Sequence, residues 1–166
     1  MSIITNLYGD LVKKCLLILI FLTLTSTSTY GDNLKDGLIA YSNQDFEKAF
    51  HLLKPFASEG NTEVQERLGN MYLNGWGVKQ NYKEAIKLYQ LVVEKGGRSA
   101  AFFKLGNIYK NGLGVKQSYK EAIRLYRIAS EAGNKNAQIA LGKMYENGQG
   151  SKQDYQEAVK WILKAA

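Results

Sequence analysis

The chain has 166 residues, with 22 basic and 15 acidic side chains, one histidine and one cysteine. A net charge of +7 is mildly basic, which favours acidic partners or surfaces. A single histidine and a single cysteine cannot build a zinc site, and the sequence offers no nucleophile paired with a base. It also contains no recognised nucleic-acid-binding motif. We therefore expect no catalytic residue, no metal, no cofactor and no nucleic-acid partner.

Residues 1–31 are predicted to be a signal peptide. Lys13 and Lys14 precede an apolar run at residues 15–24, and small polar residues follow it. The run is about half of the roughly 20 residues that a membrane-spanning helix needs. We therefore expect a periplasmic or secreted protein, whose mature form would hold no cysteine. The alternative is a membrane-tethered scaffold anchored by residues 11–24, the only case in which membrane contact is expected.

Residues 32–60 are predicted to form a degenerate helix pair that caps the N-terminal end of a repeat array. Apolar residues keep a helical phase on both sides of the turn Ser42-Asn43-Gln44, which lacks glycine. Atypical terminal units are expected in stacked repeats. Pro55 lies inside the second helix, where it predicts a kink or an early helix end.

Residues 61–166 contain one pattern three times, at 61–97, 98–134 and 135–166. The block that begins at Leu68-Gly69 recurs 37 residues on at Leu105-Gly106, and 36 residues further at Leu141-Gly142. In each copy an apolar stripe, a Gly-x-Gly turn and a second apolar stripe predict two helices. The predicted fold class is all-α, a right-handed α/α solenoid of stacked helix-turn-helix repeats.

The repeated glycines have distinct predicted roles. A glycine inside a helix costs roughly 1 kcal/mol relative to alanine, so its recurrence at the Leu-Gly position predicts a close approach of two helix backbones. The Asn-Gly pairs at 74–75, 111–112 and 147–148 predict helix ends, because both residues tolerate the left-handed conformation.

This pattern resembles the Sel-one-like repeat family, a branch of the tetratricopeptide-like α/α repeats. The family signature A-x-x-x-L-G-x-x-Y-x-x-G-x-G-V, with the helix that follows it, is matched over about residues 61–166. Departures include Ser151 in place of valine. The resemblance implies a bacterial, non-enzymatic module that binds a protein partner. Cysteine-rich relatives imply an alternative, an envelope hydrolase of β-lactam or cell-wall type, but their cysteines are absent here and His51 is the sole histidine.

The candidate partner-binding residues lie on the first helix of each repeat, which lines the concave face in α/α solenoids. Exposed positions there differ between copies while scaffold positions recur. Trp76 lies in a turn where the other copies have Leu113 and Gln149; it either forms an exposed hot spot or packs on the neighbouring repeat. Trp161 is expected in the core. The candidates are Arg67, Asn70, Leu73, Trp76, Lys104, Asn107, Lys110, Lys143 and Glu146.

Charged residues recur in register along the second helices. A basic residue occupies one repeat position and a glutamate stands three residues before it, as in Glu121 and Arg124. Such pairs support helices weakly, so a solvated outer face is favoured over a stripe that binds an acidic partner.

The last predicted helix carries Trp161, Ile162 and Leu163, and no polar capping helix follows it in this sequence. Uncovered apolar surface at a solenoid end can recruit another chain. Association through this helix is therefore a candidate interaction, against the alternative that the end is a tolerable edge.

Overall fold

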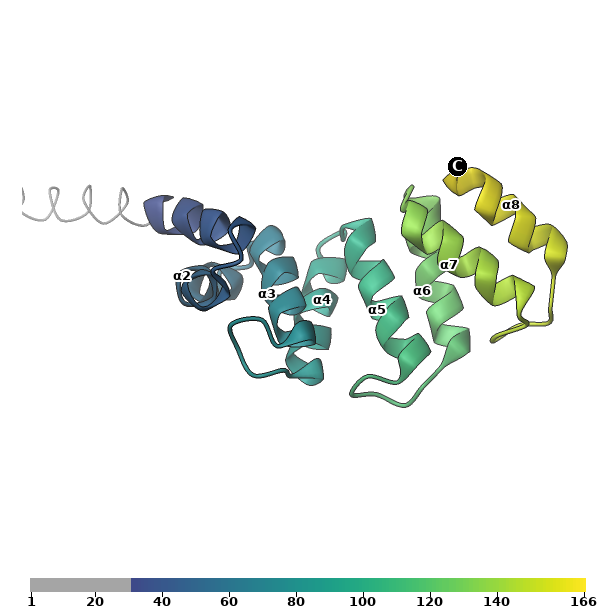
Figure 1. The fold of residues 1–166 in the computed structure, drawn as a ribbon, viewed down its shortest axis with the longest axis horizontal. Coiled ribbons are helices and arrows are strands. Elements are labelled where there is room, and N and C mark those ends of the chain that lie inside the picture. The colour runs from purple at the N-terminus through teal and green to yellow at the C-terminus, as the bar shows by residue number, and fades with distance from the viewer. Residues whose placement is uncertain (1–30) are drawn as a thin grey trace, which may run out of the picture.

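The computed structural model describes residues 31–166, which form an array of paired helices without a β-strand in that range (Figure 1). The predicted signal peptide lies, except for Gly31, outside the described residues. Residues 31–42 are helical and pack on the next helix. The helices that follow are α2 (Phe46–Ser58), α3 (Thr62–Asn74), α4 (Tyr82–Glu94), α5 (Ser99–Asn111), α6 (Tyr119–Glu131), α7 (Lys135–Glu146) and α8 (Tyr155–Ala165). This arrangement confirms the predicted all-α solenoid.

The helix ends follow from local capping chemistry. The side chain of Asn61 accepts a hydrogen bond from the Val64 backbone N–H at 3.1 Å, which satisfies one donor at the start of α3. Gly75 and Gly112 close α3 and α5 in the left-handed conformation, as the Asn-Gly pairs predicted. At the end of α7 the left-handed residue is Gly148, one position after the cap.

Pro55 does not end α2, so the prediction of an early helix end is wrong. The helix continues to Ser58. Phe56 and Ala57, which follow the proline, are both buried in the core. Their burial offsets the backbone hydrogen bond that proline cannot make.

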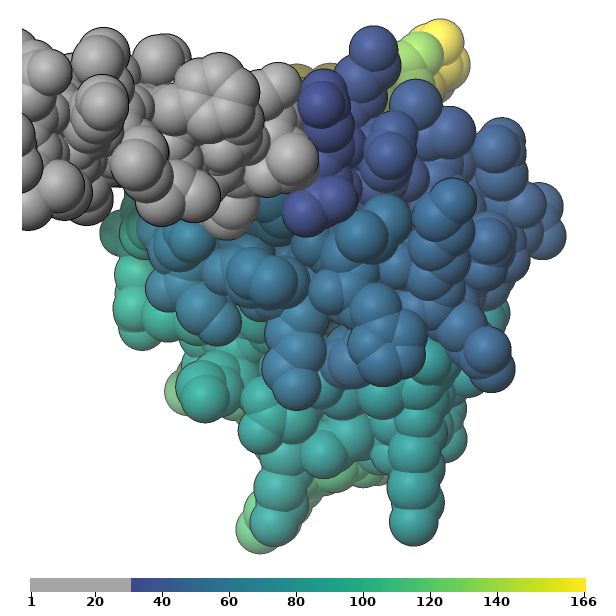
Figure 2. Space-filling model, turned by 90° about the vertical axis from the view of Figure 1, so that its left-hand side faces the viewer, coloured from purple at the N-terminus to yellow at the C-terminus, as the bar shows by residue number. Residues whose placement is uncertain are grey.

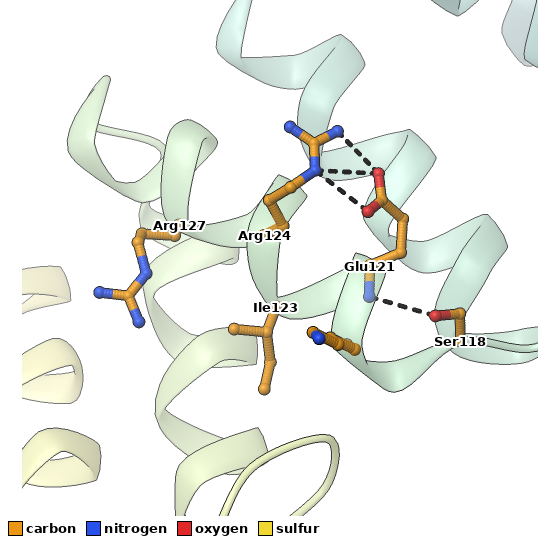
Figure 3. A pocket seen from close by; sticks show the side chains of 6 residues that line it. Ser118, Glu121, Ile123, Arg124 and Arg127 are labelled. Atoms are coloured by element: carbon orange, nitrogen blue, oxygen red, sulfur yellow. Dashed lines mark hydrogen bonds and ion pairs between the residues drawn. The ribbon is translucent and has the colours of Figure 1, made fainter.

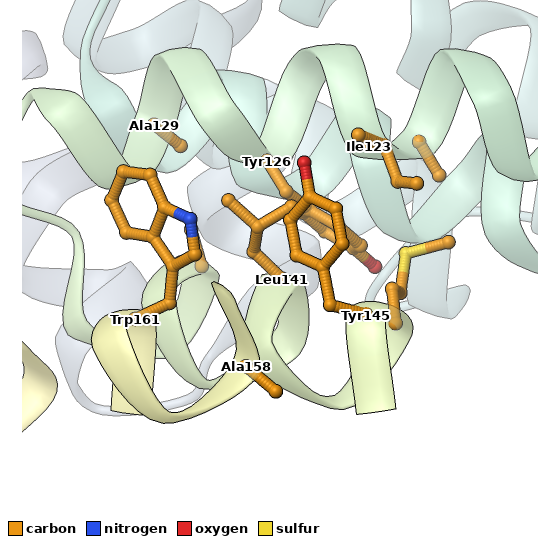
Figure 4. Packing of buried hydrophobic residues seen from close by; sticks show 10 residues of the cluster. Ile123, Tyr126, Ala129, Leu141, Tyr145, Ala158 and Trp161 are labelled. Atoms are coloured by element: carbon orange, nitrogen blue, oxygen red, sulfur yellow. The ribbon is translucent and has the colours of Figure 1, made fainter. Parts of the chain in front are cut away.

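The hydrophobic core is divided into three clusters, and each cluster joins neighbouring helix pairs. In the cluster of Figure 4, Tyr126 comes from α6, Leu141 from α7 and Trp161 from α8. Another cluster joins α4, α5 and α6. The remaining cluster lies at the N-terminal end and joins residues 31–42, α2, α3 and Leu88 of α4. Trp161 is only 5% exposed, which confirms its predicted place in the core. The second helix of one pair thus forms part of the core of the next pair.

The glycine inside each first helix makes room mainly for a side chain. A Cβ atom on Gly69 would lie 2.8 Å from Cε1 of Tyr89, and one on Gly106 would lie 2.5 Å from Cε1 of Tyr126. In these two pairs the atoms nearest to the glycine therefore belong to a tyrosine ring rather than to a backbone. In the last pair a Cβ atom on Gly142 would also lie 3.0 Å from a backbone oxygen of α8, so the backbones do approach there.

Each Gly-x-Gly turn rests on the preceding helix pair. Gly77 has φ 63°, and a Cβ atom there would lie 2.3 Å from the backbone carbonyl carbon of Phe46 at the start of α2. The side-chain amide of Gln80 donates to the Leu73 carbonyl at 2.8 Å and holds the turn closed. The same amide-to-carbonyl bond recurs from Gln117 to Lys110 and from Gln153 to Glu146. The left-handed conformation of Gly77 and its close contact with Phe46 together require glycine at this position.

We expect Gly77→Ala to destabilise the protein by about 3 kcal/mol, because it combines left-handed strain of about 1 kcal/mol with a clash against backbone that cannot rotate away. Gly96→Ala is the matched control, since Gly96 has φ 87° and open space around its Cα. Urea unfolding of both variants measures the difference. Equal losses of unfolding free energy would show that the contact with α2 contributes nothing.

Candidate functional site

A surface pocket of about 490 Å³ lies beside Trp76, between the first two helix pairs. The Trp76 ring stacks on Phe46 with centroids 4.9 Å apart and planes inclined by 14°. It nevertheless remains 40% exposed, so Trp76 packs on the neighbouring repeat and still reaches the surface. Its role as a binding hot spot stays a prediction. Figure 2 views the molecule from this end, with the early described residues in blue and later residues in teal below them. The pocket is lined by Tyr41, Ser42, Gln44, Phe46, Arg67 and Trp76.

Arg67 supplies the positive charge of this pocket. Its Nη2 lies 2.5 Å from the Glu63 carboxylate one helical turn earlier, and its guanidinium lies 5.1 Å from the centre of the Tyr41 ring. Burial raises the pKa of Tyr41, and interactions with Asn70 and Arg67 partly oppose that shift. The Tyr41 hydroxyl therefore keeps its proton at neutral pH. The pocket combines an aromatic wall with one partly compensated cation.

The structure brings together two of the predicted residues, Arg67 and Trp76, and adds lining residues that sequence reasoning missed. Tyr41 and Phe46 belong to the degenerate first pair, where no site was predicted. One signal could have found Phe46. It occupies the repeat position of Tyr82 and Tyr119, and the second glycine of the following turn rests on each of these residues.

Asn70 and Asn107, both predicted to face a partner, form part of the scaffold. The hydroxyl of Tyr89 donates to Oδ1 of Asn70 at 2.9 Å, and the hydroxyl of Tyr126 donates to Oδ1 of Asn107 at 2.6 Å. Both tyrosines are fully buried. Each asparagine thus accepts the hydrogen bond of a buried hydroxyl, which would lower the stability of the fold if it had no acceptor.

The two other helix pairs lack both members of this hydrogen-bonded pair. In the last repeat the corresponding positions hold Lys143 and Ile162, and in the first repeat they hold Leu38 and Leu53. Where the tyrosine is absent, the asparagine is absent too. The difference between Asn70 and Lys143 therefore reflects internal packing, and it gives no independent evidence for a binding surface.

The remaining candidates are divided between packing and surface. Leu73 packs partly against the core cluster of α4, α5 and α6. Lys104 and Lys110 are half-buried on α5, whereas Lys143 and Glu146 are exposed on α7. None of these side chains lines the pocket beside Trp76.

A second pocket, of about 370 Å³, lies on α6 and contains three basic residues (Figure 3). Arg124 points to the Glu121 carboxylate, and its Nη2 donates at 2.7 Å. This hydrogen bond raises the pKa of Arg124. Arg127 points away from that pair, and its guanidinium donates to the Tyr145 hydroxyl. Both arginines are thus paired within the protein, which agrees with the solvated outer face favoured from sequence.

Residues 31–166 show neither a metal-binding cluster nor a membrane-spanning helix. Among residues 31–166 there is no group of three or more His, Cys, Asp or Glu side chains that could hold a metal ion. His51 is exposed on α2, with its ring edge-on to Phe50 at 6.2 Å. In the same part of the chain, no helix has the length and apolar character that crossing a membrane requires.

We expect the protein to lose stability at alkaline pH through its buried tyrosines. Burial raises the pKa of Tyr89 and of Tyr126, so the folded state holds both phenolic protons more tightly than the unfolded chain. This contribution is complete below the unfolded pKa, about 10, and falls as the pH rises past it, by up to about 1.4 kcal/mol per pH unit for each tyrosine.

Unfolding by urea at a series of pH values above about 10 measures this slope. Tyr89→Phe and Tyr126→Phe should each make the decline shallower, whereas Tyr155→Phe, which alters an exposed ring, should leave it unchanged. Identical slopes in all four proteins would contradict the assignment to the buried pair.

Comparison with known proteins places this architecture in a family. The model of the Sel1 repeat matches residues 30–61, 62–96, 99–134 and 135–166. The crystal structure of a Sel1 repeat protein from Oxalobacter formigenes is similar, with 30% identity and a TM-score of 0.72, over 80% of this chain and 54% of that one. A second is c5321, a protective antigen of uropathogenic Escherichia coli with an SLR fold, at 31% identity and a TM-score of 0.75, over 82% of this chain and 30% of that one.

A curated relative matches a shorter part of the chain. The exopolysaccharide production negative regulator of Rhizobium leguminosarum bv. viciae is 37% identical over 76 residues, which is 43% of this chain and 28% of that protein. This chain thus spans little more than half of one of these three relatives and less than a third of the other two. The four consecutive matches nevertheless cover nearly all of residues 30–166, and this chain belongs to the Sel1 repeat family.

Proposed function

We propose that this protein is an exported, non-enzymatic scaffold that binds a protein partner through the pocket beside Trp76. Sel1 repeat proteins are generally protein-interaction scaffolds, which supports the class of function. The observation that carries the choice of surface is Trp76, a large aromatic side chain that is 40% exposed beside a pocket. Tryptophan is enriched among residues that dominate binding energy.

The pocket is ordered before a partner arrives. One face of the Trp76 ring is covered by Phe46, and Tyr41 packs edge-on against Phe46 with centroids 5.6 Å apart. The turn that carries Trp76 is closed by the Gln80 amide. A side chain that is already immobilised loses little conformational entropy on binding, so more of the contact energy appears as affinity.

Arg67 defines the chemistry of the partner. Its guanidinium already forms an ion pair with Glu63, so Arg67 contributes orientation and specificity to partner binding more than affinity. The arrangement fits a segment that places an apolar side chain against Trp76 and a carboxylate or carbonyl oxygen towards Arg67. The chain as a whole carries a net charge of +7, which is consistent with an acidic segment.

The non-enzymatic part of the proposal is supported by the scaffold roles of the repeated residues. Tyr89 and Tyr126 are buried, and each hydroxyl is hydrogen-bonded to an asparagine, so the structure accounts for both as packing residues.

We expect Trp76→Leu to weaken partner binding by about 2 kcal/mol or more, roughly thirtyfold, because leucine keeps the turn packed but removes the indole. Leucine is the residue at this position in the next repeat, at Leu113. Gln149→Ala, at the same position of the last repeat, is the control. Crosslinking in intact cells followed by mass spectrometry identifies the partner, and titration with the purified partner gives the affinity.

Arg67→Met should weaken the same complex by about tenfold and reduce its dependence on salt. Melting temperatures within a few degrees of wild type are required of both variants, since a loss of fold would also remove binding. Unchanged affinity in both Trp76→Leu and Arg67→Met would show that the partner binds elsewhere.

The export part of the proposal rests on the sequence of residues 1–31 and has its own test. N-terminal sequencing of the protein recovered from its native host should find a chain that begins after the apolar run of residues 15–24, because a signal peptide is removed. A membrane-bound form that retains residues 11–24 would instead support the tethered scaffold. A chain that starts at Met1 in the soluble cell interior would contradict export.

A further inference from the structure

A cleft of about 300 Å³ lies between α2 and the helix pair formed by α3 and α4. Its apolar lining includes the buried side chains of Leu68 and Leu88. Its polar lining includes Tyr72 and Glu84. The volume is at the lower end of the range for ligand pockets, so it suits a single side chain better than a larger molecule. No residue is shared between this cleft and the pocket beside Trp76.

Two acceptors at this cleft are free to bind a donor. Within residues 31–166, the Tyr72 hydroxyl has no hydrogen-bond partner, and the Glu84 carboxylate has neither a hydrogen bond nor an ion pair. Both side chains are half-buried. Burial raises the pKa of Tyr72, and the charge of Glu84 raises it further, so the two groups lie near each other.

The glutamates at the same position of the later repeats are occupied. Glu121 accepts a hydrogen bond from Arg124 at 2.7 Å. Glu157 accepts one from Lys160 at 2.7 Å and one from the Trp161 indole at 3.0 Å. The carboxylate at the cleft between α2 and α4 is therefore the one that a ligand can reach without displacing a partner.

The last junction between helix pairs shows which group such a position accepts. There the Arg127 guanidinium donates to the Tyr145 hydroxyl and lies 6.0 Å from the centre of the Tyr145 ring. Figure 4 shows this ring pointing from α7 towards α6. The hydrogen bond from Lys160 lowers the pKa of Glu157, and the charge of Arg127 adds to that effect. A guanidinium thus lies near both a tyrosine hydroxyl and a carboxylate.

The first junction has the same positions but lacks the arginine. Lys54 occupies the position of Arg127, eight residues after the first residue of its helix, and Tyr72 occupies that of Tyr145, at the end of a Leu-Gly-x-Met-Tyr block. The Lys54 ammonium lies instead over the Phe50 ring, 5.7 Å from its centre. The place that an arginine fills at the last junction is therefore open here.

We propose that the cleft between α2 and α4 binds an arginine side chain of a partner protein. The guanidinium donates to the Tyr72 hydroxyl and to the Glu84 carboxylate, because its planar fork presents donors to two acceptors at once. The methylene stem of the arginine packs on Leu88. This proposal does not depend on the pocket beside Trp76.

Two lysines also line the cleft, and neither prevents this contact. Lys87 corresponds to Lys160, which pairs with Glu157 although Arg127 also acts on that carboxylate. One glutamate at this position therefore accommodates two cations. Lys54 is exposed, so water and salt screen its charge.

The test titrates N-acetyl-arginine methylamide into the ¹⁵N-labelled protein and follows the backbone amides by NMR. Amides around Tyr72 and Glu84 should shift and saturate, with a dissociation constant on the order of 1 mM. N-acetyl-lysine methylamide should bind at least about fivefold more weakly, because an ammonium lacks the planar fork. Equal binding of the two probes, or no saturating shift in this region, overturns the proposal. Free arginine that binds tenfold more tightly than the first probe would also overturn it, because the ligand is then the amino acid.

Variants of the two acceptors locate the contact. Glu84→Gln should weaken binding of the arginine probe at least about tenfold, and Tyr72→Phe about fivefold, because a charged acceptor contributes more than a neutral one. Tyr109→Phe is the matched control and should change nothing, since the glutamate of that repeat, Glu121, is already bound by Arg124. Wild-type affinity in both Glu84→Gln and Tyr72→Phe would place the probe elsewhere.

Lys54→Arg supplies the guanidinium from within the chain, as Arg127 does at the last junction. This exposed and conservative change should leave the melting temperature within a few degrees of wild type and should abolish binding of the probe. Undiminished binding to Lys54→Arg contradicts the proposal, because the cleft would then not be the place that an arginine fills.

Discussion

Each helix pair of this protein buries apolar surface both between its own two helices and against the neighbouring pairs. The three core clusters each take residues from the second helix of one pair and from both helices of the next. A single pair would leave the part of this surface that faces its neighbours in water, and so could not offset the entropy of ordering its own chain. The contact between consecutive repeats is therefore the constraint on which the turns and the pockets depend.

The same constraint explains where recognition is proposed. The pocket beside Trp76 forms where the turn of one repeat meets the start of the preceding second helix, and its two stacked rings come from different repeats. This pocket thus arises from repeat stacking, and it requires no residue type that the scaffold does not already use.

Much of the fold could be predicted because its signals are local or periodic. The 36- and 37-residue spacing gave the helix pairs, and the Asn-Gly pairs gave the ends of α3 and α5. Trp161 was placed in the core because it shares its position with Leu88 and Leu125. Features set by contacts between repeats were harder to predict.

The pocket shows why. Phe46 and Trp76 are 30 residues apart in sequence, and their contact depends on how one repeat seats on another. Asn70 and Asn107 looked like variable surface positions, because the hydroxyls they satisfy lie 19 residues away on the partner helix. Helical phase alone assigns a face to a residue, but it does not say which side chain reaches that residue across the helix pair.

The tyrosine–asparagine bond also bears on how such an array can change by recombination. Exchanging α3–α4 for α5–α6 as a whole would preserve the bond, because each of these pairs carries both partners. Exchanging α6 for α8 alone would place Ile162 against Asn107, and exchanging α5 for α7 alone would leave the Tyr126 hydroxyl without its acceptor. The smallest unit that can be exchanged while this hydrogen bond is kept is therefore the helix pair and not the single helix.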